Sequence, residues 1–290
     1  MNSPSLTRLR VGLINPGAMG TPVGIAAKLS GASVHWASTG RSGASLERAQ
    51  SAGFESLAST EALVEHASLI ISVCPPHAAA TVADEVAALG FDGIYVDANA
   101  VSPDTVRAID DRITQAGASF VDGSIIGGPP SKRGTTRLYL SGAKAERVRA
   151  AFVDGHFDLV VLGRQVGEAS ALKMAFAAWT KGSAALLLAI RALARTHGVE
   201  RALLDEWAQS MPGLTETSTE AIDGSVPKAW RFIGEMEQIA ATFGGAHLPD
   251  GFHQAAAEVY RRLDSFKNQT SPDLDLVMAA LANDHRDDLS

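Results

Sequence analysis

The feature that most constrains this chain is an apolar run that enters a glycine-containing turn and leaves it directly as a helix. Val11–Asn15 has the composition of a buried strand, Pro16 and Gly17 form the turn, and Ala18–Ser30 has a helical pattern that Gly31 ends. A buried strand that passes through so short a turn into a helix is typical of the first step of an α/β fold. The start of the chain therefore predicts one strand of a sheet with a helix packed on it.

The same alternation continues through the first half of the chain. Further β-like runs are expected at Ser33–Ser38, Leu69–Cys74, Ile94–Asp97, Phe120–Asp122, Leu138–Ser141 and Leu159–Leu162. Helices are expected at Ser45–Ala52, Thr60–Ala67, Ala78–Leu89 and Pro103–Ala116, with one more stretch from Ala143. Because the strands are apolar throughout, we expect a doubly wound parallel sheet that is covered by helices on both faces.

The pattern changes to helices alone after Gly163. Gly167–Thr196 is rich in Ala and Leu and predicts one helix of roughly 45 Å, which is long for a helix confined to one small domain. More helices are expected at Arg201–Gln209, Leu214–Ile222, Ala229–Phe243, Gly251–Asp264 and Leu274–Ala282. We therefore expect an α/β domain over residues 1–164 and an all-helical domain over 165–290, joined by the long helix. The polar tail from Asn283 is expected to be frayed.

Composition limits the class of protein. The chain has 290 residues, of which 46% are hydrophobic and 20% charged, and this is a globular composition. The formal net charge of −7 argues against a general nucleic-acid binder. Cys74 is the single cysteine, so no disulfide can form within the chain, which fits a reducing compartment.

Targeting and membrane signals point the same way. Met1–Arg10 contains no apolar run of the kind found in secretory signals. Lys173, Lys181 and Arg191 interrupt the longest apolar stretch, and the uninterrupted part, Gly182–Ile190, is too short to cross a bilayer. We expect a soluble, cytoplasmic protein.

The opening turn has the chemistry of a dinucleotide site. Gly17 would let the backbone approach a pyrophosphate, Gly20 would let the helix pack closely on the strand, and the helix N-terminus would offer N–H groups to the phosphates. The first glycine of the usual Gly-x-Gly-x-x-Gly pattern is Asn15 here, and asparagine tolerates left-handed backbone angles. The alternative is an ordinary strand–turn–helix with glycine for packing. The expected contact residues are Asn15, Pro16, Gly17, Ala18 and Met19.

The end of the second strand predicts which dinucleotide is preferred. Sites for NAD usually place an acidic residue there, but none occurs from Ser33 to Leu46. Arg41 stands there instead, and it could hold a 2′-phosphate with charge-assisted hydrogen bonds. The hydroxyls expected to assist it are those of Ser38, Thr39 and Ser42. We expect a preference for NADP(H) over NAD(H); the alternative is a solvated loop arginine.

Lys173 is the candidate acid–base group. Between Ala169 and Ile190 it and Lys181 are the only charges, so Lys173 must face a cavity, find a partner or lose its proton. Burial lowers the pKa of a lysine toward the range useful for acid–base catalysis. Thr180 shares its helix face and could orient it. The alternative is a lysine whose stem is packed and whose amine reaches water.

A second cluster, Phe120–Pro130, follows a strand and contains Ser124, Gly127 and Gly128. Glycines there would let the backbone approach a ligand, although turn geometry alone could also explain them. No metal site is expected, because the 8 histidines are dispersed and no His-Glu-x-x-His pattern occurs.

Three segments, in this order, resemble the β-hydroxyacid dehydrogenase superfamily, which includes 3-hydroxyisobutyrate and 6-phosphogluconate dehydrogenases and the imine reductases. Gly12–Gly20 resembles its dinucleotide signature, and Asp122–Gly128 resembles its substrate loop, Asp-x-x-x-Ser-Gly-Gly. Gly167–Ala177 resembles its Gly-x-x-x-x-x-Lys-x-x-x-Asn segment. The Ala-Ala-Trp-Thr-Lys-Gly run that follows is most similar to a phosphogluconate-dehydrogenase-type branch of unsettled substrate.

The resemblance implies a Rossmann domain, a long interdomain helix and a helical C-terminal domain, with the active site in the cleft and often completed across a dimer. It implies that Lys173 is the catalytic lysine, and that Cys74, Pro75 and Asn99 line the nicotinamide and its ribose. Two positions depart from the family. Ile126 replaces the substrate-loop serine and Ala177 replaces the asparagine after the lysine. With Trp179 nearby in sequence, these changes predict a less polar substrate pocket.

The sequence thus predicts an NADP(H)-dependent oxidoreductase that acts on a carbonyl or alcohol carbon of a small, relatively apolar substrate. Lys173 is the expected general acid or base, and the expected substrate contacts are Ser124, Gly127, Gly128, Trp179 and Thr180. Imine reduction is the alternative activity, although Lys173 stands where standard imine reductases usually carry Asp or Tyr. A cofactor-binding sensor without turnover is a third hypothesis. The long apolar helix predicts a homodimer.

Overall fold

The computed structural model describes residues 9–130, 132–152 and 154–282. Contacts divide the chain into two compact units, Met1–Lys173 and Met174–Ser290. The boundary predicted after residue 164 lies before the one that the contacts give, after Lys173. The first turn of the long helix is hydrogen-bonded to the α/β unit and is counted with it. The tail from Asn283, predicted to be frayed, lies outside the described residues.

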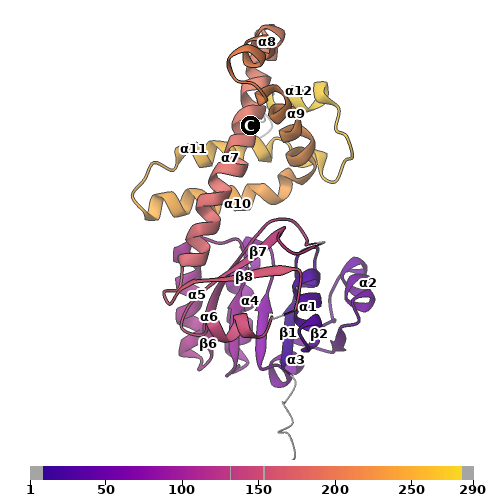
Figure 1. The fold of residues 1–290 in the computed structure, drawn as a ribbon, viewed down its shortest axis with the longest axis vertical. Coiled ribbons are helices and arrows are strands. Elements are labelled where there is room, and N and C mark those ends of the chain that lie inside the picture. Colours follow the sequence, from indigo (N-terminus) through magenta and orange to yellow (C-terminus); the bar gives the residue numbers. More distant parts are fainter. Residues whose placement is uncertain (1–8, 131, 153, 283–290) are drawn as a thin grey trace, which may run out of the picture. The chain divides into compact units, whose positions relative to one another are not determined.

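The first unit contains a sheet of eight strands in the order β3-β2-β1-β4-β5-β6-β7-β8 (Figure 1). The strands are β1 (Arg10–Ile14), β2 (Ser33–Ala37), β3 (Glu55–Leu57), β4 (Leu69–Ser72), β5 (Ile94–Asp97), β6 (Ser119–Ile126), β7 (Thr136–Ser141) and β8 (Phe157–Gly163). Each neighbouring pair is parallel except β6 with β7. This order confirms the predicted doubly wound sheet and places its switch point between β1 and β4.

Helices cover both faces of the sheet. They are α1 (Gly20–Leu29), α2 (Gly43–Ser51), α3 (Thr60–His66), α4 (Ala79–Ala88), α5 (Pro103–Gln115) and α6 (Ala145–Ala150). The core on one face joins the strands to α1, α2 and α6, and the core on the other joins them to α3, α4 and α5. Serine side chains cap α2, α3 and α5 by accepting a bond from the third residue beyond them. These predicted helices therefore begin where the sequence places a cap.

Two strands differ from the expectation. β3 is only three residues long and mostly exposed, and Leu57 is its single apolar residue, so its sequence carries no apolar run. β6 was expected to end at Asp122, but it continues to Ile126 with every residue from Phe120 onward buried. The predicted loop therefore begins four residues later, because Asp122–Ile126 pairs with β7 instead of turning away.

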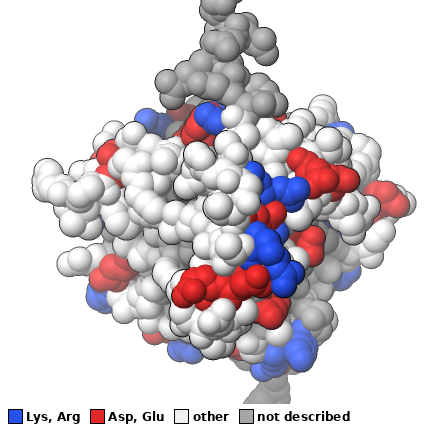
Figure 2. All heavy atoms as spheres, turned by 90° about the horizontal axis from the view of Figure 1, so that it is seen from above, with Lys and Arg blue, Asp and Glu red and all other residues white. Residues whose placement is uncertain are grey.

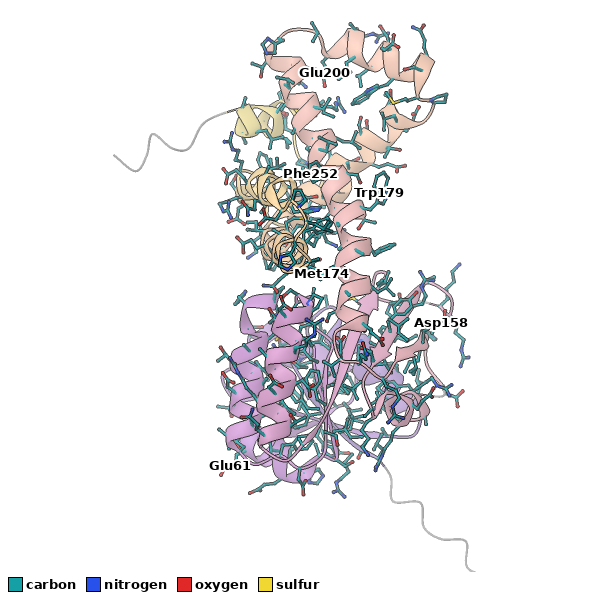
Figure 3. The ribbon with its side chains drawn as sticks, turned by 90° about the vertical axis from the view of Figure 1, so that its left-hand side faces the viewer. Glu61, Asp158, Met174, Trp179, Glu200 and Phe252 are labelled. Carbon is teal, nitrogen blue, oxygen red and sulfur yellow. The ribbon has the colours of Figure 1, made fainter. Side chains whose placement is uncertain are left out.

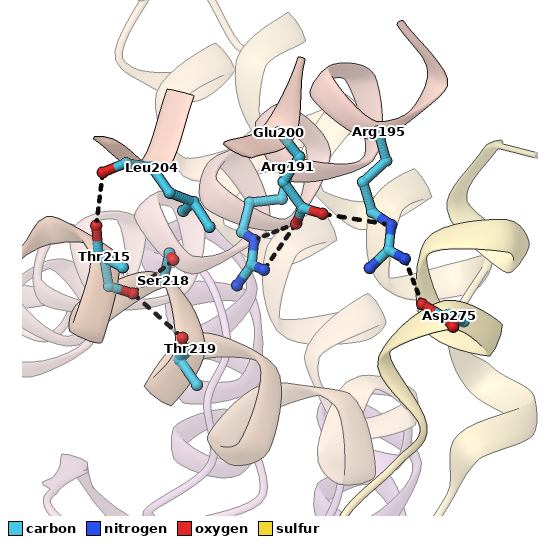
Figure 4. Close-up of polar contacts among 8 residues, drawn as sticks. All are labelled: Arg191, Arg195, Glu200, Leu204, Thr215, Ser218, Thr219 and Asp275. Carbon is cyan, nitrogen blue, oxygen red and sulfur yellow. Dashed lines mark hydrogen bonds and ion pairs between the residues drawn. The ribbon is translucent and has the colours of Figure 1, made fainter. Parts of the chain in front are cut away.

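The second unit is entirely helical in its described residues. The α-helices that contribute to it are α7 (Glu168–Thr196), which begins in the first unit, α8 (Glu200–Ser210), α9 (Leu214–Ser225), α10 (Ala229–Gly245), α11 (Gly251–Arg261) and α12 (Leu274–Ala282). Two arginines of α7 bind carboxylates of α8 and α12: Arg191 and Arg195 both contact Glu200, and Arg195 also contacts Asp275 (Figure 4). Lys181 of α7 and Glu235 of α10 form a largely buried ion pair of 2.9 Å.

Among the described residues, α7 is the helix that is long and apolar enough to cross a membrane by length and composition. However, 44% of its most apolar window is buried inside the protein, and Lys181 and Arg191 are paired with carboxylates. On the face seen in Figure 2, basic and acidic side chains are intermixed, without an extended basic surface.

Candidate active site

The switch point of the sheet contains the predicted phosphate-binding turn. Asn15 follows β1 with φ of 64°, in the left-handed region where the sequence predicted that asparagine would replace glycine. Gly17 N–H donates to the Asn15 carbonyl over 2.7 Å, and α1 begins three residues later. A Cβ on Gly20 would collide with that same carbonyl, so glycine is required there. On Gly17 a Cβ would meet only open space and one atom 4.0 Å away, which leaves room for a ligand.

Two arginines hold this turn from the side of α2. Arg41 donates to the Asn15 side-chain oxygen over 2.5 Å. The arginine that was predicted to bind a 2′-phosphate therefore lies beside the turn. Arg48 of α2 donates to the Pro16 carbonyl over 3.1 Å and to the Ser45 hydroxyl over 3.3 Å. Arg48 was not predicted. The sequence could have indicated it, because Arg48 lies on the helix that follows Arg41, seven residues farther along the chain.

The predicted hydroxyls near Arg41 already have partners in the structure. Ser38 donates to the Leu57 carbonyl over 3.2 Å and Thr39 donates to the Ala58 carbonyl. Ser42 caps α2 by accepting from Ser45 N–H. Each hydroxyl oxygen can still accept or share a bond, so their role toward a phosphate stays a prediction.

Cys74 and Asn99 meet at the ends of β4 and β5, as expected from their positions after adjacent strands. The Asn99 side-chain oxygen accepts from Cys74 N–H over 2.6 Å. Its amide nitrogen donates to Ser72 over 3.2 Å and to the Asp97 carboxylate over 2.9 Å. Asn99 N–H also donates to Asp97, over 3.0 Å. Pro75 is exposed next to this cluster, before the 3-10 helix Pro76–Ala78.

Burial sets the protonation of this cluster. It raises the pKa of the Cys74 thiol to about 11, so Cys74 is neutral at physiological pH and is not poised as a nucleophile. It also raises the pKa of the fully buried Asp97 to about 7, against the opposing effect of the hydrogen bonds from Asn99. The neighbouring Asp122 adds to the rise. Asp97 is a buried titratable group that the sequence analysis did not assign.

Asp122 of β6 binds the start of α7. One of its carboxylate oxygens accepts from the backbone N–H groups of Gly167 and Ser170, both over 3.0 Å, and from Ser141 over 3.0 Å. The other accepts from the Ser170 hydroxyl over 2.7 Å. The negative charge lies where the dipole of a helix N-terminus stabilises it. Ala169 N–H in turn donates to Ser141 over 3.1 Å.

Lys173 lies one turn farther along α7 and is half-buried. Its side-chain nitrogen donates to the Ile125 carbonyl of β6 over 2.8 Å. Ser124, next to Ile125 on β6, is 1% exposed, and its hydroxyl has no hydrogen-bond partner among the described residues. A buried hydroxyl without a protein partner is expected where a ligand or water completes the bonding. Lys173 of α7 is thus bonded to the strand that carries the predicted substrate serine.

The glycines of the predicted substrate loop form the turn after β6. Gly127 has φ of 119°, and a Cβ there would lie 2.5 Å from the Thr135 carbonyl oxygen, so the turn requires glycine. Gly128 is exposed, and its carbonyl accepts from Thr136 over 2.6 Å. Ile126, the apolar replacement in the family motif, is 4% exposed.

The remaining predicted contacts belong to the second unit. Thr180 is exposed and its hydroxyl donates to the Phe176 carbonyl over 3.3 Å. Trp179 is 75% exposed, and Figure 3 shows it on the side of α7 opposite Phe252. Their roles toward a substrate stay predictions.

Family models and one solved structure identify the type of protein. Residues 10–153 match the NAD binding domain of 6-phosphogluconate dehydrogenase, and residues 194–263 match a domain of unknown function, DUF1932. A solved conserved protein of unknown function, reported as structurally similar to 3-hydroxyacid dehydrogenases, is 27% identical with a TM-score of 0.67. The match covers 93% of this chain and 99% of that one. The chain belongs to the β-hydroxyacid dehydrogenase superfamily. The resemblance predicted from the motifs is thereby confirmed.

Two relatives match parts of the chain. An uncharacterized 28.5 kDa protein of Methanothermus fervidus is 36% identical over 143 residues, which are 49% of this chain and 54% of that protein. The mitochondrial 3-hydroxyisobutyrate dehydrogenase of Drosophila melanogaster is 31% identical over 93 residues, or 31% of this chain and 29% of that protein. The chain therefore matches about half, or less, of the length of these two relatives.

Proposed function

We propose that the protein is an NADP(H)-dependent oxidoreductase that interconverts a carbonyl and an alcohol on a small, relatively apolar substrate. The single observation that carries the proposal is the 2.8 Å bond from the Lys173 side chain to the carbonyl of Ile125, the strand residue that follows Ser124, whose buried hydroxyl has no partner among the described residues. An amine bonded to the strand that also carries an unsatisfied buried hydroxyl suits proton transfer at an oxygen atom bound there.

The residues of the opening turn fit a dinucleotide. The α1 N-terminus and the open side of Gly17 suit a pyrophosphate, and Asn15, Pro16, Ala18 and Met19 would surround it. Arg41 and Arg48 supply two guanidinium groups where a 2′-phosphate needs positive charge, and this supports the preference for NADP(H). When bound, the nicotinamide supplies or accepts the hydride of the reaction.

Lys173 performs the proton transfer in this proposal. It donates a proton to the substrate oxygen during reduction and removes one during oxidation. Ser124, with the backbone N–H groups of Gly127 and Gly128, holds the substrate. The backbone bond to Ile125 limits the rotamers available to the lysine, which reduces the entropy lost when it meets a substrate.

Imine reduction is the second candidate. The observation that favours it is the buried, apolar Ile126 beside the substrate loop, where the family motif has serine, together with the fully buried Ala177. A site without the serine hydroxyl has one polar contact fewer for a hydroxyacid, and its apolar surface suits an imine substrate better.

A homodimer is part of the proposal. Phe176, Trp179, Leu186 and Leu193 lie on one face of α7 and are 44–75% exposed, so they form an apolar stripe. A stripe of this kind on a soluble protein suits a second copy of the same surface, which buries both. A reducing, cytoplasmic location also belongs to the proposal, because the sequence has a single cysteine.

An NADPH-depletion assay tests the proposal. The purified protein is incubated with NADPH and a panel of apolar aldehydes, ketones and cyclic imines, and with NADH in parallel. We expect consumption of NADPH with carbonyl compounds, at higher catalytic efficiency than with NADH. Turnover of imines alone would favour the second candidate. NADPH binding without turnover of any compound would favour a sensor and contradict the proposed reaction.

A further inference from the structure

Four small polar side chains cross the sheet in one row just below its carboxyl edge. Ser72 of β4 is the register partner of Asp97 of β5, and Asp97 is the partner of Asp122 of β6. Asp122 is in turn the partner of Ser141 of β7. All four are at most 1% exposed. Burying two carboxyls side by side is costly, and core packing alone would favour apolar residues at these positions.

The two carboxyls accept hydrogen bonds from different parts of the chain. Asp97 accepts both of its bonds from Asn99, which also holds Cys74 N–H, so Asp97 fixes the loop ends of β4 and β5. Asp122 accepts from Gly167 and Ser170, so it fixes the first turn of α7. The first set of bonds leads to the residues expected at the nicotinamide, and the second leads to the helix that carries Lys173.

We propose that Asp97 and Asp122 are positioning residues that align the two halves of the reaction site: Asp97 holds the cofactor half through Asn99, and Asp122 holds the proton-transfer half through the first turn of α7. The proposal rests on the proposed function for the identity of the two halves. Neither carboxyl contacts the reacting atoms, and each acts through the residues that it binds.

The geometry of α7 explains how Asp122 reaches Lys173. Ser170, which binds Asp122 through both its N–H and its hydroxyl, lies three residues before Lys173. Residues three apart share one helix face, so rotation of the first turn would carry the lysine away from the Ile125 carbonyl. Asp122 and Ile125 both belong to β6, and this one strand therefore fixes the helix and receives the lysine.

Two variants separate the halves. Asp97→Asn and Asp122→Asn each remove a buried negative charge with little change in shape. Asp110→Asn, which alters a half-buried carboxyl of α5 outside the row, is the matched control. The first readout is the dissociation constant of NADPH from fluorescence titration, which needs no substrate. The second is the rate of acetylation of Lys173 by trace acetic anhydride, measured by mass spectrometry against the exposed Lys144 in the same sample.

We expect Asp97→Asn to weaken NADPH binding by about tenfold, the value of one hydrogen bond to a charged group, and to leave the Lys173 labelling ratio unchanged. We expect Asp122→Asn to change the Lys173 labelling ratio by about threefold or more and to leave NADPH binding unchanged. A threefold change is at the lower end of the interaction energies measured between residues of one hydrogen-bond network. Parallel changes of both readouts in both variants, or no change in either, would overturn the proposal.

Milder variants keep the test decisive if a carboxyl variant does not fold. Ser72→Ala removes one acceptor of Asn99 and should weaken NADPH binding alone, and Ser170→Ala removes one donor to Asp122 and should alter Lys173 labelling alone. Exchanged or identical effects of these two variants would contradict the assignment. Because neither readout needs turnover, failure of the proposed reaction would leave this result interpretable.

Discussion

The side-chain nitrogen of Lys173 donates a hydrogen bond of 2.8 Å to the carbonyl oxygen of Ile125, the next-to-last residue of β6. A helix residue is thereby tied to the strand whose end leads into the Gly127–Gly128 turn. A backbone carbonyl accepts a bond from the amine without supplying a compensating negative charge. This relationship, more than the lysine's place in an apolar helix, supports its role as the acid–base group.

Arg41 and Arg48 should determine the preference for NADP(H). Arg41→Ala or Arg48→Ala removes a guanidinium beside the phosphate-binding turn, and each should weaken NADPH binding by about tenfold or more. Binding of NADH should change little, because it has no 2′-phosphate. Arg112→Ala, an exposed arginine of α5, is the control. Equal losses for both cofactors would show that the arginines only hold the turn.

Gly20 should tolerate no side chain. In Gly20→Ala the new Cβ would collide with the Asn15 carbonyl, so the turn must shift. We expect a lower melting temperature and loss of NADPH binding. Gly43→Ala is the matched control, because a Cβ at Gly43 would meet no atom within 4 Å. Unchanged NADPH affinity in Gly20→Ala would contradict the dinucleotide role of the turn.

The apolar stripe of α7 should hold the dimer together. Trp179→Glu combined with Leu193→Glu places two charges on a face that the proposed dimer buries. Light scattering at micromolar concentration should give twice the mass of one chain for the wild type and one chain mass for the variant. Leu276→Glu, an exposed leucine of α12 outside the stripe, should leave the mass unchanged. A monomeric wild type would contradict the dimer.

Cofactor binding should weaken as the pH falls through about 7. Burial, opposed by the Asn99 hydrogen bonds, raises the pKa of Asp97 to about 7, with Asp122 adding to the rise. Protonation removes charge from the acceptor that holds Asn99, so the affinity for NADH should decline on the acid side. NADH is the probe because a 2′-phosphate would titrate in the same range. In Asp97→Asn the profile should be flat.

The groups that face Asp97 do not obscure this measurement. Burial raises the pKa of Cys74 to about 11 and that of Tyr95 well above its usual value, so both stay neutral between about pH 5 and 8. Burial raises the pKa of Asp122 as well, although the bonds from Ser170 oppose the rise. Asp122→Asn therefore serves as the control: the acid decline should persist there. A flat wild-type profile would contradict the assignment of Asp97.

The pKa of Asp97 also has a consequence for stability, with the opposite slope. Its pKa in the folded protein lies above its ordinary value of 3.8, so the folded state binds more protons between that value and about 7. Its contribution to the free energy of unfolding therefore decreases as the pH rises through this window. The melting temperature of Asp97→Asn, relative to the wild type, should increase over the same window.

Local sequence predicted much of the fold because its signals are strong and short-range. The turn at Asn15 was predicted from the tolerance of asparagine for positive φ, and its φ of 64° confirms this. β3 was missed because it is a three-residue edge strand in which Leu57 alone is apolar, too little for an apolar pattern. β6 was predicted too short because its glycine and serine resemble loop residues, whereas pairing with β7 keeps them in the strand.

The predicted site was incomplete where the third dimension decides. Arg48 lies beyond the sequence window expected for the 2′ position, and only the return of α2 toward the turn brings it to Pro16. Asp97 ends an apolar strand and Asp122 interrupts one, and a charged residue at such a position is visible in the sequence. That the two are register partners on adjacent strands depends on the strand order. Strand order is a tertiary property that no local pattern encodes.

Substitution of the lysine tests the central claim most directly. Lys173→Met keeps most of the length of the side chain and removes the amine, and Lys144→Met, at an exposed lysine of the same unit, is the control. On any carbonyl substrate found in the NADPH assay, we predict that Lys173→Met lowers kcat by about 10²- to 10⁴-fold, as expected for loss of a general acid, with the NADPH dissociation constant unchanged. A Lys173→Met enzyme that turns over at the wild-type rate would contradict the account.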